Sequence, residues 1–149
     1  MAAYTISEFA DKLAEIMQVI AEEFIKYQNV EFYKAKITFP QFIILELLHK
    51  RGVLNMTEMA HIINVTTAAM TGIIDRLVRD GYVSRENDPD DRRVIKVRAT
   101  SKGNKIVKAM LEHRKDTIMK VFGGVSGSER EEYLNILTRI VNSFEAQKR

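Results

Sequence analysis

A run of turn-forming residues ends in two arginines, and this pattern predicts a cationic loop tip. Residues 87–91 read Asn-Asp-Pro-Asp-Asp, and Arg92 and Arg93 follow directly. A narrow minor groove of DNA has an enhanced negative potential that attracts inserted arginine side chains. Because Asp91 precedes Arg93 by two positions, we expect its carboxylate to hold the Arg93 guanidinium in a bidentate pair. The alternative is a solvated turn without a ligand, since surface Asp–Arg pairs are common and contribute little energy.

A second segment combines small polar side chains with a helical apolar stripe. Apolar residues from Met70 to Leu77 recur at the i, i+3, i+4 and i+7 positions of a helix that Thr66 or Thr67 would cap. The other face suits an approach to base edges, because threonine hydroxyls hydrogen-bond to bases or phosphates and methyl groups contact thymine. The candidate DNA-contacting residues are Thr66, Thr67, Ala68, Thr71, Gly72, Asp75 and Arg76 here, and Asp91, Arg92, Arg93 and Lys96 near the cationic tip.

The residues before this helix predict the rest of a helix-turn-helix. Asn55 and Glu58 have the spacing of a capping box, so a first helix is expected to begin there. Asn64 lies where the chain must turn, and asparagine tolerates the left-handed conformation better than most residues. Gly81 is placed to end the second helix. An ordinary pair of helices with a solvated threonine-rich face is the alternative interpretation.

A β-hairpin is expected after the second helix. Tyr82 and Val83 begin one strand, and apolar residues alternate with polar ones over residues 95–100. This period of two is typical of a half-buried strand, with Ile95, Val97 and Ala99 on the inner side. The hairpin therefore carries the cationic tip at its turn.

The basic residues are concentrated in one part of the chain. The net charge of the 149 residues is only +3, but residues 92–108 contain seven basic residues and no acid, whereas residues 1–49 contain seven acids and four lysines. This concentration suits the neutralisation of phosphates. The chain has no cysteine, which excludes disulfides, thiol switches and cysteine-ligated metals. Without a long apolar run or a signal-peptide pattern, we expect a single-domain, soluble, cytoplasmic protein.

The sequence resembles the MarR (multiple antibiotic resistance regulator) family of winged helix-turn-helix transcription factors. The wing of that family ends in Asp-x-Arg, five further residues and Leu-Thr. Here Asp91-Arg92-Arg93 is followed by residues 94–98 and by Ala99-Thr100, so that Ala99 replaces the leucine. The similarity also covers the order of elements and the length, and so spans nearly the whole chain.

The resemblance implies a mainly α-helical fold of six helices with a small β-hairpin wing. It implies a winged helix-turn-helix lobe over residues 38–100 and a helical dimerisation region formed by residues 1–37 and 101–149. In this arrangement, the helix from about residue 66 to residue 79 reads the major groove of DNA. Arg93 enters the minor groove, and Asp91 braces it.

Amphipathic helices are expected at both ends of the chain. Thr5 is placed to cap the first, which runs to about Lys34, and Ser126 or Ser128 to cap the last. Periodicity alone is equally compatible with folding back onto the chain's own domain and with pairing to a second copy. The resemblance favours a homodimer, which requires a pseudo-palindromic operator. The expected dimer residues are Ile6, Phe9, Leu13, Tyr133, Leu137, Ile140 and Phe144.

A small-molecule effector is a further expectation from the resemblance. Members of the family often bind small aromatic or phenolic anions between the dimer helices and the DNA-binding lobe. The corresponding residues here are Tyr27, Tyr33, Lys36, Phe39 and Phe42, although aromatic side chains at such positions also serve as core. A ligand at this junction would change the separation of the two DNA-reading helices and release the DNA. Repression is the expected mode of action, because a dimer on a promoter blocks polymerase.

No enzymatic chemistry is expected. His49, His61 and His113 are far apart and form no HxxxH or HExxH pattern, and neither a glycine-rich phosphate loop nor a catalytic Ser or Cys arrangement occurs. We therefore expect no cofactor and no metal. A zinc-responsive regulator of the same fold and a winged-helix module that binds proteins remain alternatives. The basic run over residues 92–108 favours DNA over a protein partner.

Overall fold

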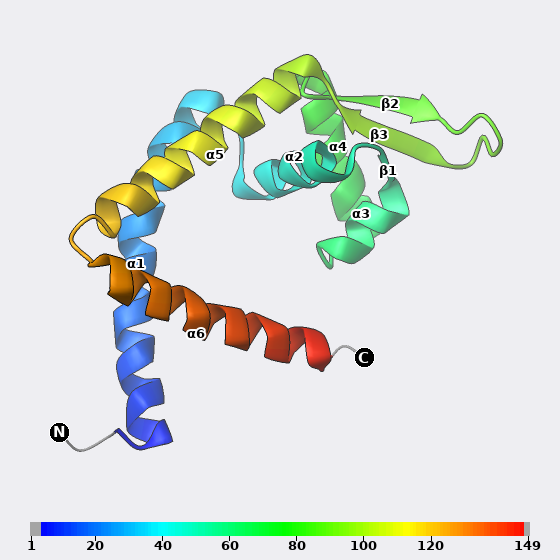
Figure 1. Ribbon diagram of the computed structural model, residues 1–149. Helices are drawn as coiled ribbons and strands as arrows, with labels where there is room; N and C mark the ends of the chain where they lie inside the picture. The colour runs from blue at the N-terminus through cyan, green and yellow to red at the C-terminus, as the bar shows by residue number, and fades with distance from the viewer. Residues whose placement is uncertain (1–3, 148–149) are drawn as a thin grey trace. The chain divides into compact units, whose positions relative to one another are not determined.

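The computed structural model describes residues 4–147, except for the side chains of residues 27–33, and its elements follow the expected order (Figure 1). The chain divides after His113 into two units, which are described separately. The predicted six helices and small antiparallel sheet are confirmed, whereas the predicted limits of the DNA-binding lobe stay a prediction. The elements are α1 (Ile6–Ala35), α2 (Phe39–Arg51), β1 (Leu54–Asn55), α3 (Met56–Ile62), α4 (Thr67–Arg79), β2 (Val83–Asn87), β3 (Ile95–Ala99), α5 (Ser101–Val121) and α6 (Gly127–Ala146).

Local side-chain contacts fix where the helices begin. The Asn55 carboxamide oxygen accepts a hydrogen bond from the Glu58 N–H at 2.8 Å, and the Glu58 carboxylate accepts one from the Asn55 N–H at 2.9 Å. This reciprocal capping box begins α3, as predicted. Thr66 rather than Thr67 caps α4, because its hydroxyl accepts the Ala69 N–H at 3.1 Å. Ser126 rather than Ser128 caps α6.

The two turns that position α4 have the expected geometry. Asn64, between α3 and α4, has a left-handed φ of 53°, and Gly81, after α4, has a φ of 77°. The Gly81 N–H donates to the Val78 carbonyl at 3.0 Å, and the Tyr82 N–H donates to the Leu77 carbonyl at 2.8 Å. These two bonds form a Schellman motif, which ends α4 and leads directly into β2.

The wing is a three-stranded antiparallel sheet with the order β1-β3-β2. The predicted hairpin pairs Val83 with Ala99 at its base and Asn87 with Ile95 near its tip. β1 was not predicted, because a strand of two residues has no measurable period. Ile95 was expected on the inner side but is exposed, since the hairpin extends beyond the helices and only its base has a core to face (Figure 1).

One apolar core holds the first unit together. It combines the inner faces of α2, α3 and α4 with the central strand and the beginning of α5. The predicted stripe of α4 is confirmed, because Met70, Ile74 and Leu77 are fully buried and Ile73 is partly buried against them. The largest fully buried side chains are Ile44, Leu45, Leu48, Met59, Met70, Ile74, Leu77, Val97 and Val107.

The terminal helices carry many exposed apolar side chains. None of the residues of α6 is buried. The ring of its Tyr133 packs with its centroid 5.6 Å from that of Phe122, the residue after α5. All seven residues expected at a dimer interface are exposed in the single chain. None of the described helices is long and apolar enough to cross a membrane.

Candidate nucleic-acid interface

The outer face of α4 is an exposed surface of small polar side chains. All seven residues that the sequence predicted on this face, from Thr66 to Arg76, are exposed. The Thr66 hydroxyl oxygen is occupied by the Ala69 N–H, which leaves its O–H free to donate. The Thr71 hydroxyl donates to the Thr67 carbonyl at 2.9 Å, which leaves its oxygen free to accept. The face therefore offers both a donor and an acceptor, while contact with DNA stays a prediction.

Asp88 organises the turn of the wing. Its carboxylate accepts the N–H groups of Asp90 at 2.8 Å and Asp91 at 3.3 Å, and it forms an ion pair with the Lys96 ammonium at 2.6 Å. The hydrogen bond from Lys96 and that from the Asp90 N–H lower the pKa of Asp88, and the same carboxylate raises the pKa of Lys96. The predicted DNA contact Lys96 is thus directed to the wing itself. Asp88 was not singled out from the sequence, although carboxylates in turns often bond to nearby backbone N–H groups.

Asp91 contacts the backbone of Arg93 rather than its guanidinium. The Arg93 N–H donates to the Asp91 carboxylate at 2.9 Å. The predicted bidentate pair with the guanidinium is wrong, because a carboxylate two residues before an N–H forms the tighter Asx turn. Asp91 therefore shapes the loop, and among the described residues no carboxylate pairs with Arg92 or Arg93.

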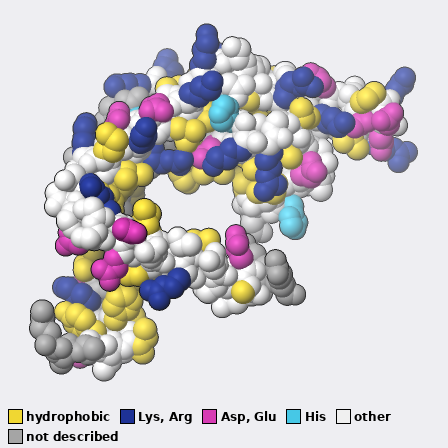
Figure 2. Space-filling view, viewed as in Figure 1, with side chains coloured by type: hydrophobic (Ala, Val, Ile, Leu, Met, Phe, Trp, Pro, Cys, Tyr) yellow, Lys and Arg dark blue, Asp and Glu magenta, His cyan; other side chains and the backbone are white. Residues whose placement is uncertain are grey.

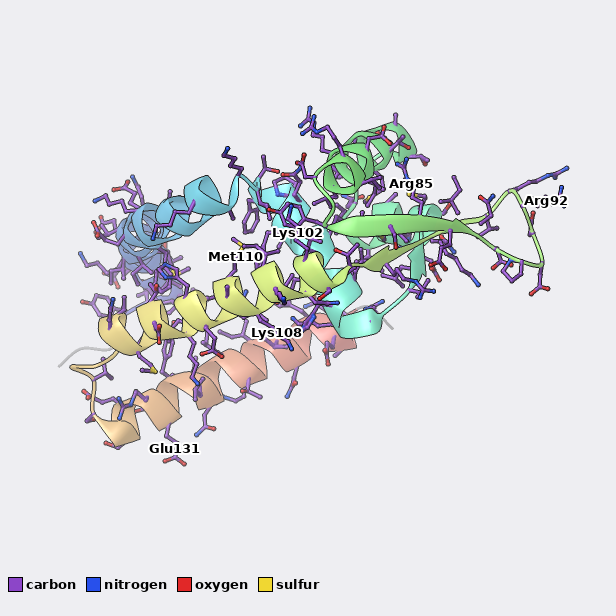
Figure 3. All side chains as sticks on the ribbon, turned by 90° about the horizontal axis from the view of Figure 1, so that it is seen from above. Arg85, Arg92, Lys102, Lys108, Met110 and Glu131 are labelled. Atoms are coloured by element: carbon purple, nitrogen blue, oxygen red, sulfur yellow. The ribbon has the colours of Figure 1, made fainter. Side chains whose placement is uncertain are left out.

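The wing tip is highly charged. Basic and acidic side chains gather there in Figure 2, and Figure 3 shows Arg92 extending away from the loop. Arg92 and Arg93 are both exposed. Their guanidinium groups are available to phosphates or to a groove.

A groove joins α4 to the wing. It has a volume of about 390 Å³ and brings together residues that are far apart in the sequence. Thr67 and Thr71 come from α4, and Arg93 comes from the loop of the wing. The groove also includes Arg85 of β2, which was not singled out from the sequence because its role depends on how distant elements pack. Its full lining is Asn55, Met56, Thr57, Thr67, Thr71, Arg85, Arg93, Val94 and Ile95.

Arg85 forms an ion pair with Asp75 of α4. The distance from the guanidinium Nη2 to the carboxylate Oδ1 is 2.6 Å. Asp75 was expected to face DNA, but its carboxylate is engaged with this strand. This pair connects α4 to β2 of the wing.

The residues proposed for an effector site have different environments. Phe42 belongs to the core and Phe39 is exposed, while Lys36 directly follows α1 and has a left-handed φ of 54°. The Tyr27 and Tyr33 side chains lie outside the described residues. Phe42 is thus packed in the protein interior and serves as a core residue. The effector site stays a prediction.

The histidines offer no cluster of ligands in the described part of the chain. No group of three His, Cys, Asp or Glu side chains there is close enough to hold a metal ion. His49 instead lies with Nδ1 2.7 Å from the Asn104 carboxamide oxygen, which links α2 to α5.

These elements define a winged helix-turn-helix protein, with an exposed helix beside a basic hairpin. Residues 37–95 match the model of the MarR family. The HTH-type transcriptional repressor YetL of Bacillus subtilis (strain 168) is 35% identical over 99 residues, which cover 65% of this chain. The chain spans only 59% of the length of YetL.

Solved structures also resemble this chain. A MepR-like protein complexed with pseudoligands is 31% identical with a TM-score of 0.61, and the match covers 87% of this chain and 92% of that one. A MarR family protein from Bacillus stearothermophilus has the same fold, with a TM-score of 0.84 at 22% identity over 95% of this chain and 99% of that one. The chain belongs to the MarR family. Its relatives are transcriptional regulators and not enzymes, in agreement with the expectation from the sequence.

Proposed function

We propose that this protein is a sequence-specific, double-stranded DNA-binding transcriptional regulator. The observation that carries the proposal is the groove that Thr67 and Thr71 of α4 line together with Arg93 of the wing. A helix with small polar side chains reads base edges in a major groove, while an arginine of the wing enters the adjacent minor groove. Arg76 and Arg92 add exposed positive charge for the phosphates.

The regulator acts as a homodimer through its terminal helices. Support comes from the exposed apolar residues on α1 and α6, for example Phe9 and Leu137. Large exposed apolar surfaces are uncommon on monomers and mark interfaces. A two-fold dimer presents two copies of α4 to an inverted repeat. Sedimentation of the free protein is expected to give twice the mass of one chain, and a monomer would contradict this part.

Repression and release by a small ligand complete the proposed mechanism. YetL is itself named a repressor, and the MepR-like relative was solved with pseudoligands. A small aromatic or phenolic anion is the proposed effector, which shifts the dimer to a state with a different separation of the α4 helices. Titration of benzoate and salicylate into the protein–DNA complex is expected to release DNA, and unchanged stability and affinity would exclude this effector class.

Selection from random duplexes tests the DNA-binding function. The purified protein is incubated with a random pool, and the retained DNA is sequenced. We expect an enriched inverted repeat with half-sites about one helical turn (10–10.5 base pairs) apart. Binding to any duplex without enrichment would contradict sequence-specific regulation, and an absence of binding to DNA would favour a protein partner.

A further inference from the structure

We propose that Asp75 is a positioning residue for DNA recognition, which holds Arg85 and thereby fixes the wing relative to α4. This inference rests on the proposed DNA-binding function. Asp75 then favours DNA binding, although its negative charge lies on the face of α4 that is proposed to meet the DNA. Asp75 lies on the exposed face of α4, and Arg85 lies on β2 beside the groove.

The geometry of the pair supports this role. The charged atoms are 2.6 Å apart, and the side chains are 55% exposed for Asp75 and 31% exposed for Arg85. Exposed ion pairs contribute little to the stability of a fold. The pair therefore acts on orientation, because it holds the long, flexible Arg85 side chain at one point on α4. Figure 3 shows Arg85 where the hairpin leaves the helical part of the lobe.

Other ion pairs of the wing join residues of the wing itself. Arg98 bonds to Glu86 at 2.9 Å, and Lys96 bonds to Asp88 at 2.6 Å. These pairs stiffen the hairpin but leave its angle to α4 unaffected. The contact between Asp75 and Arg85 is different, because its two partners belong to the two elements that must engage DNA together.

The angle between helix and wing decides whether both elements reach the DNA. Thr67 of α4 and Arg93 of the wing line the same groove, so the two contacts require one fixed separation of these elements. A hairpin that projects beyond the core magnifies a small rotation at its base into a larger displacement of its tip. Loss of the Asp75 carboxylate is therefore expected to weaken binding at a specific site, where both contacts are made.

Charge repulsion alone predicts the opposite change in DNA affinity when the Asp75 carboxylate is lost. An acidic side chain on a DNA-facing surface repels phosphates, so its removal should strengthen binding to every duplex. Repulsion and positioning can be separated by experiment, because only the specific complex needs α4 and the wing at a fixed relative orientation. Neutralisation of Asp75 is thus expected to raise affinity for random DNA while it lowers affinity for the operator.

The test compares Asp75→Asn with Glu86→Gln as a matched control. Each substitution removes one negative charge and breaks one exposed ion pair of the same lobe, but only the first pair links α4 to the wing. Affinities for the selected operator and for a random duplex are measured by fluorescence anisotropy over a range of salt concentrations. Unfolding by denaturant checks that both variants fold.

For Asp75→Asn we expect at least about a threefold loss of operator affinity with an unchanged salt slope, together with a gain for random DNA. Hydroxyl-radical footprints are expected to lose protection in the minor groove at the wing positions. For Glu86→Gln we expect no loss on either DNA. The double variant Asp75→Asn/Arg85→Gln should lose no more operator affinity than Arg85→Gln alone, because the two residues act through each other.

Operator affinity of Asp75→Asn equal to or above that of the wild-type protein would overturn the inference, since Asp75 would then act only as a repulsive charge. A lower salt slope for Arg85→Gln, without any loss for Asp75→Asn, would also overturn it and make Arg85 a direct phosphate contact. Failure of the wild-type protein to distinguish operator from random DNA would instead overturn the proposed function, and the inference with it.

Discussion

At the scale of single residues, carboxylates at the wing turn act on the backbone. Asp88 and Asp91 both accept N–H groups of the loop, so they shape it and leave Arg92 and Arg93 exposed. The sequence predicted a turn with a cationic tip. The predicted partner of Asp91, the Arg93 guanidinium, was wrong, because the backbone N–H of Arg93 takes this carboxylate in an Asx turn.

The first prediction concerns the protonation of Asp88. Its lowered pKa means that its contribution to stability is present above the unfolded pKa of about 4 and is lost as the pH falls through the folded value. The raised pKa of Lys96 means that its contribution is present below about pH 10 and is lost as the pH rises through the folded value. Carboxyl NMR titration is expected to place the Asp88 midpoint below the ordinary value of an aspartate, and Lys96→Gln should move it upward. A midpoint that Lys96→Gln leaves unchanged would contradict the assigned cause.

The second prediction concerns Arg93 and specificity. Because its guanidinium is exposed and lines the groove beside α4, Arg93→Ala is expected to weaken operator binding by about 1–3 kcal/mol. Arg98→Ala is the matched control, since it removes the same charge from a side chain already paired with Glu86. Equal losses for the two variants would mean that Arg93 contributes only general charge.

At the scale of elements, local chemistry explains why the boundaries of the helices were predictable. The capping pair Asn55–Glu58, the left-handed Asn64 and the left-handed Gly81 each act through neighbours within a few residues, so they are visible in the sequence. Contacts between distant elements have no such signal. Neither β1 nor the bond between Asp75 and Arg85 was predictable from periodicity, because each depends on how separate elements pack.

The third prediction tests the junction between the wing and α5. A Cβ at Gly103, in the first turn of α5, would overlap the backbone carbonyl oxygen of Tyr82. Gly103→Ala is therefore expected to destabilise the fold by about 1–3 kcal/mol, although alanine normally favours helices. Gly72→Ala on α4 meets no neighbouring atom and should stabilise the fold by up to about 1 kcal/mol. Denaturant unfolding measures both, and equal effects would contradict the close approach.

At the scale of the whole molecule, the exposed apolar residues of α1 and α6 favour association of two copies of the chain. Periodicity indicated amphipathic helices, and the structure leaves residues such as Phe9 and Ile140 exposed in the single chain. A sequence cannot distinguish burial within a chain from burial between chains, because both require the same apolar stripe. The proposed homodimer would bury these exposed side chains and would supply the second copy of α4 that an inverted repeat requires.

The most direct test of the account varies the spacing of the operator. The affinity of the protein is measured for the selected inverted repeat and for a duplex with about half a helical turn (5 base pairs) inserted between the half-sites. A dimer that reads both halves with two α4 helices is expected to lose most of its specific affinity, since the insertion turns one half-site to the opposite side of the DNA. Equal affinity for the two duplexes would contradict recognition of an operator by a two-fold dimer.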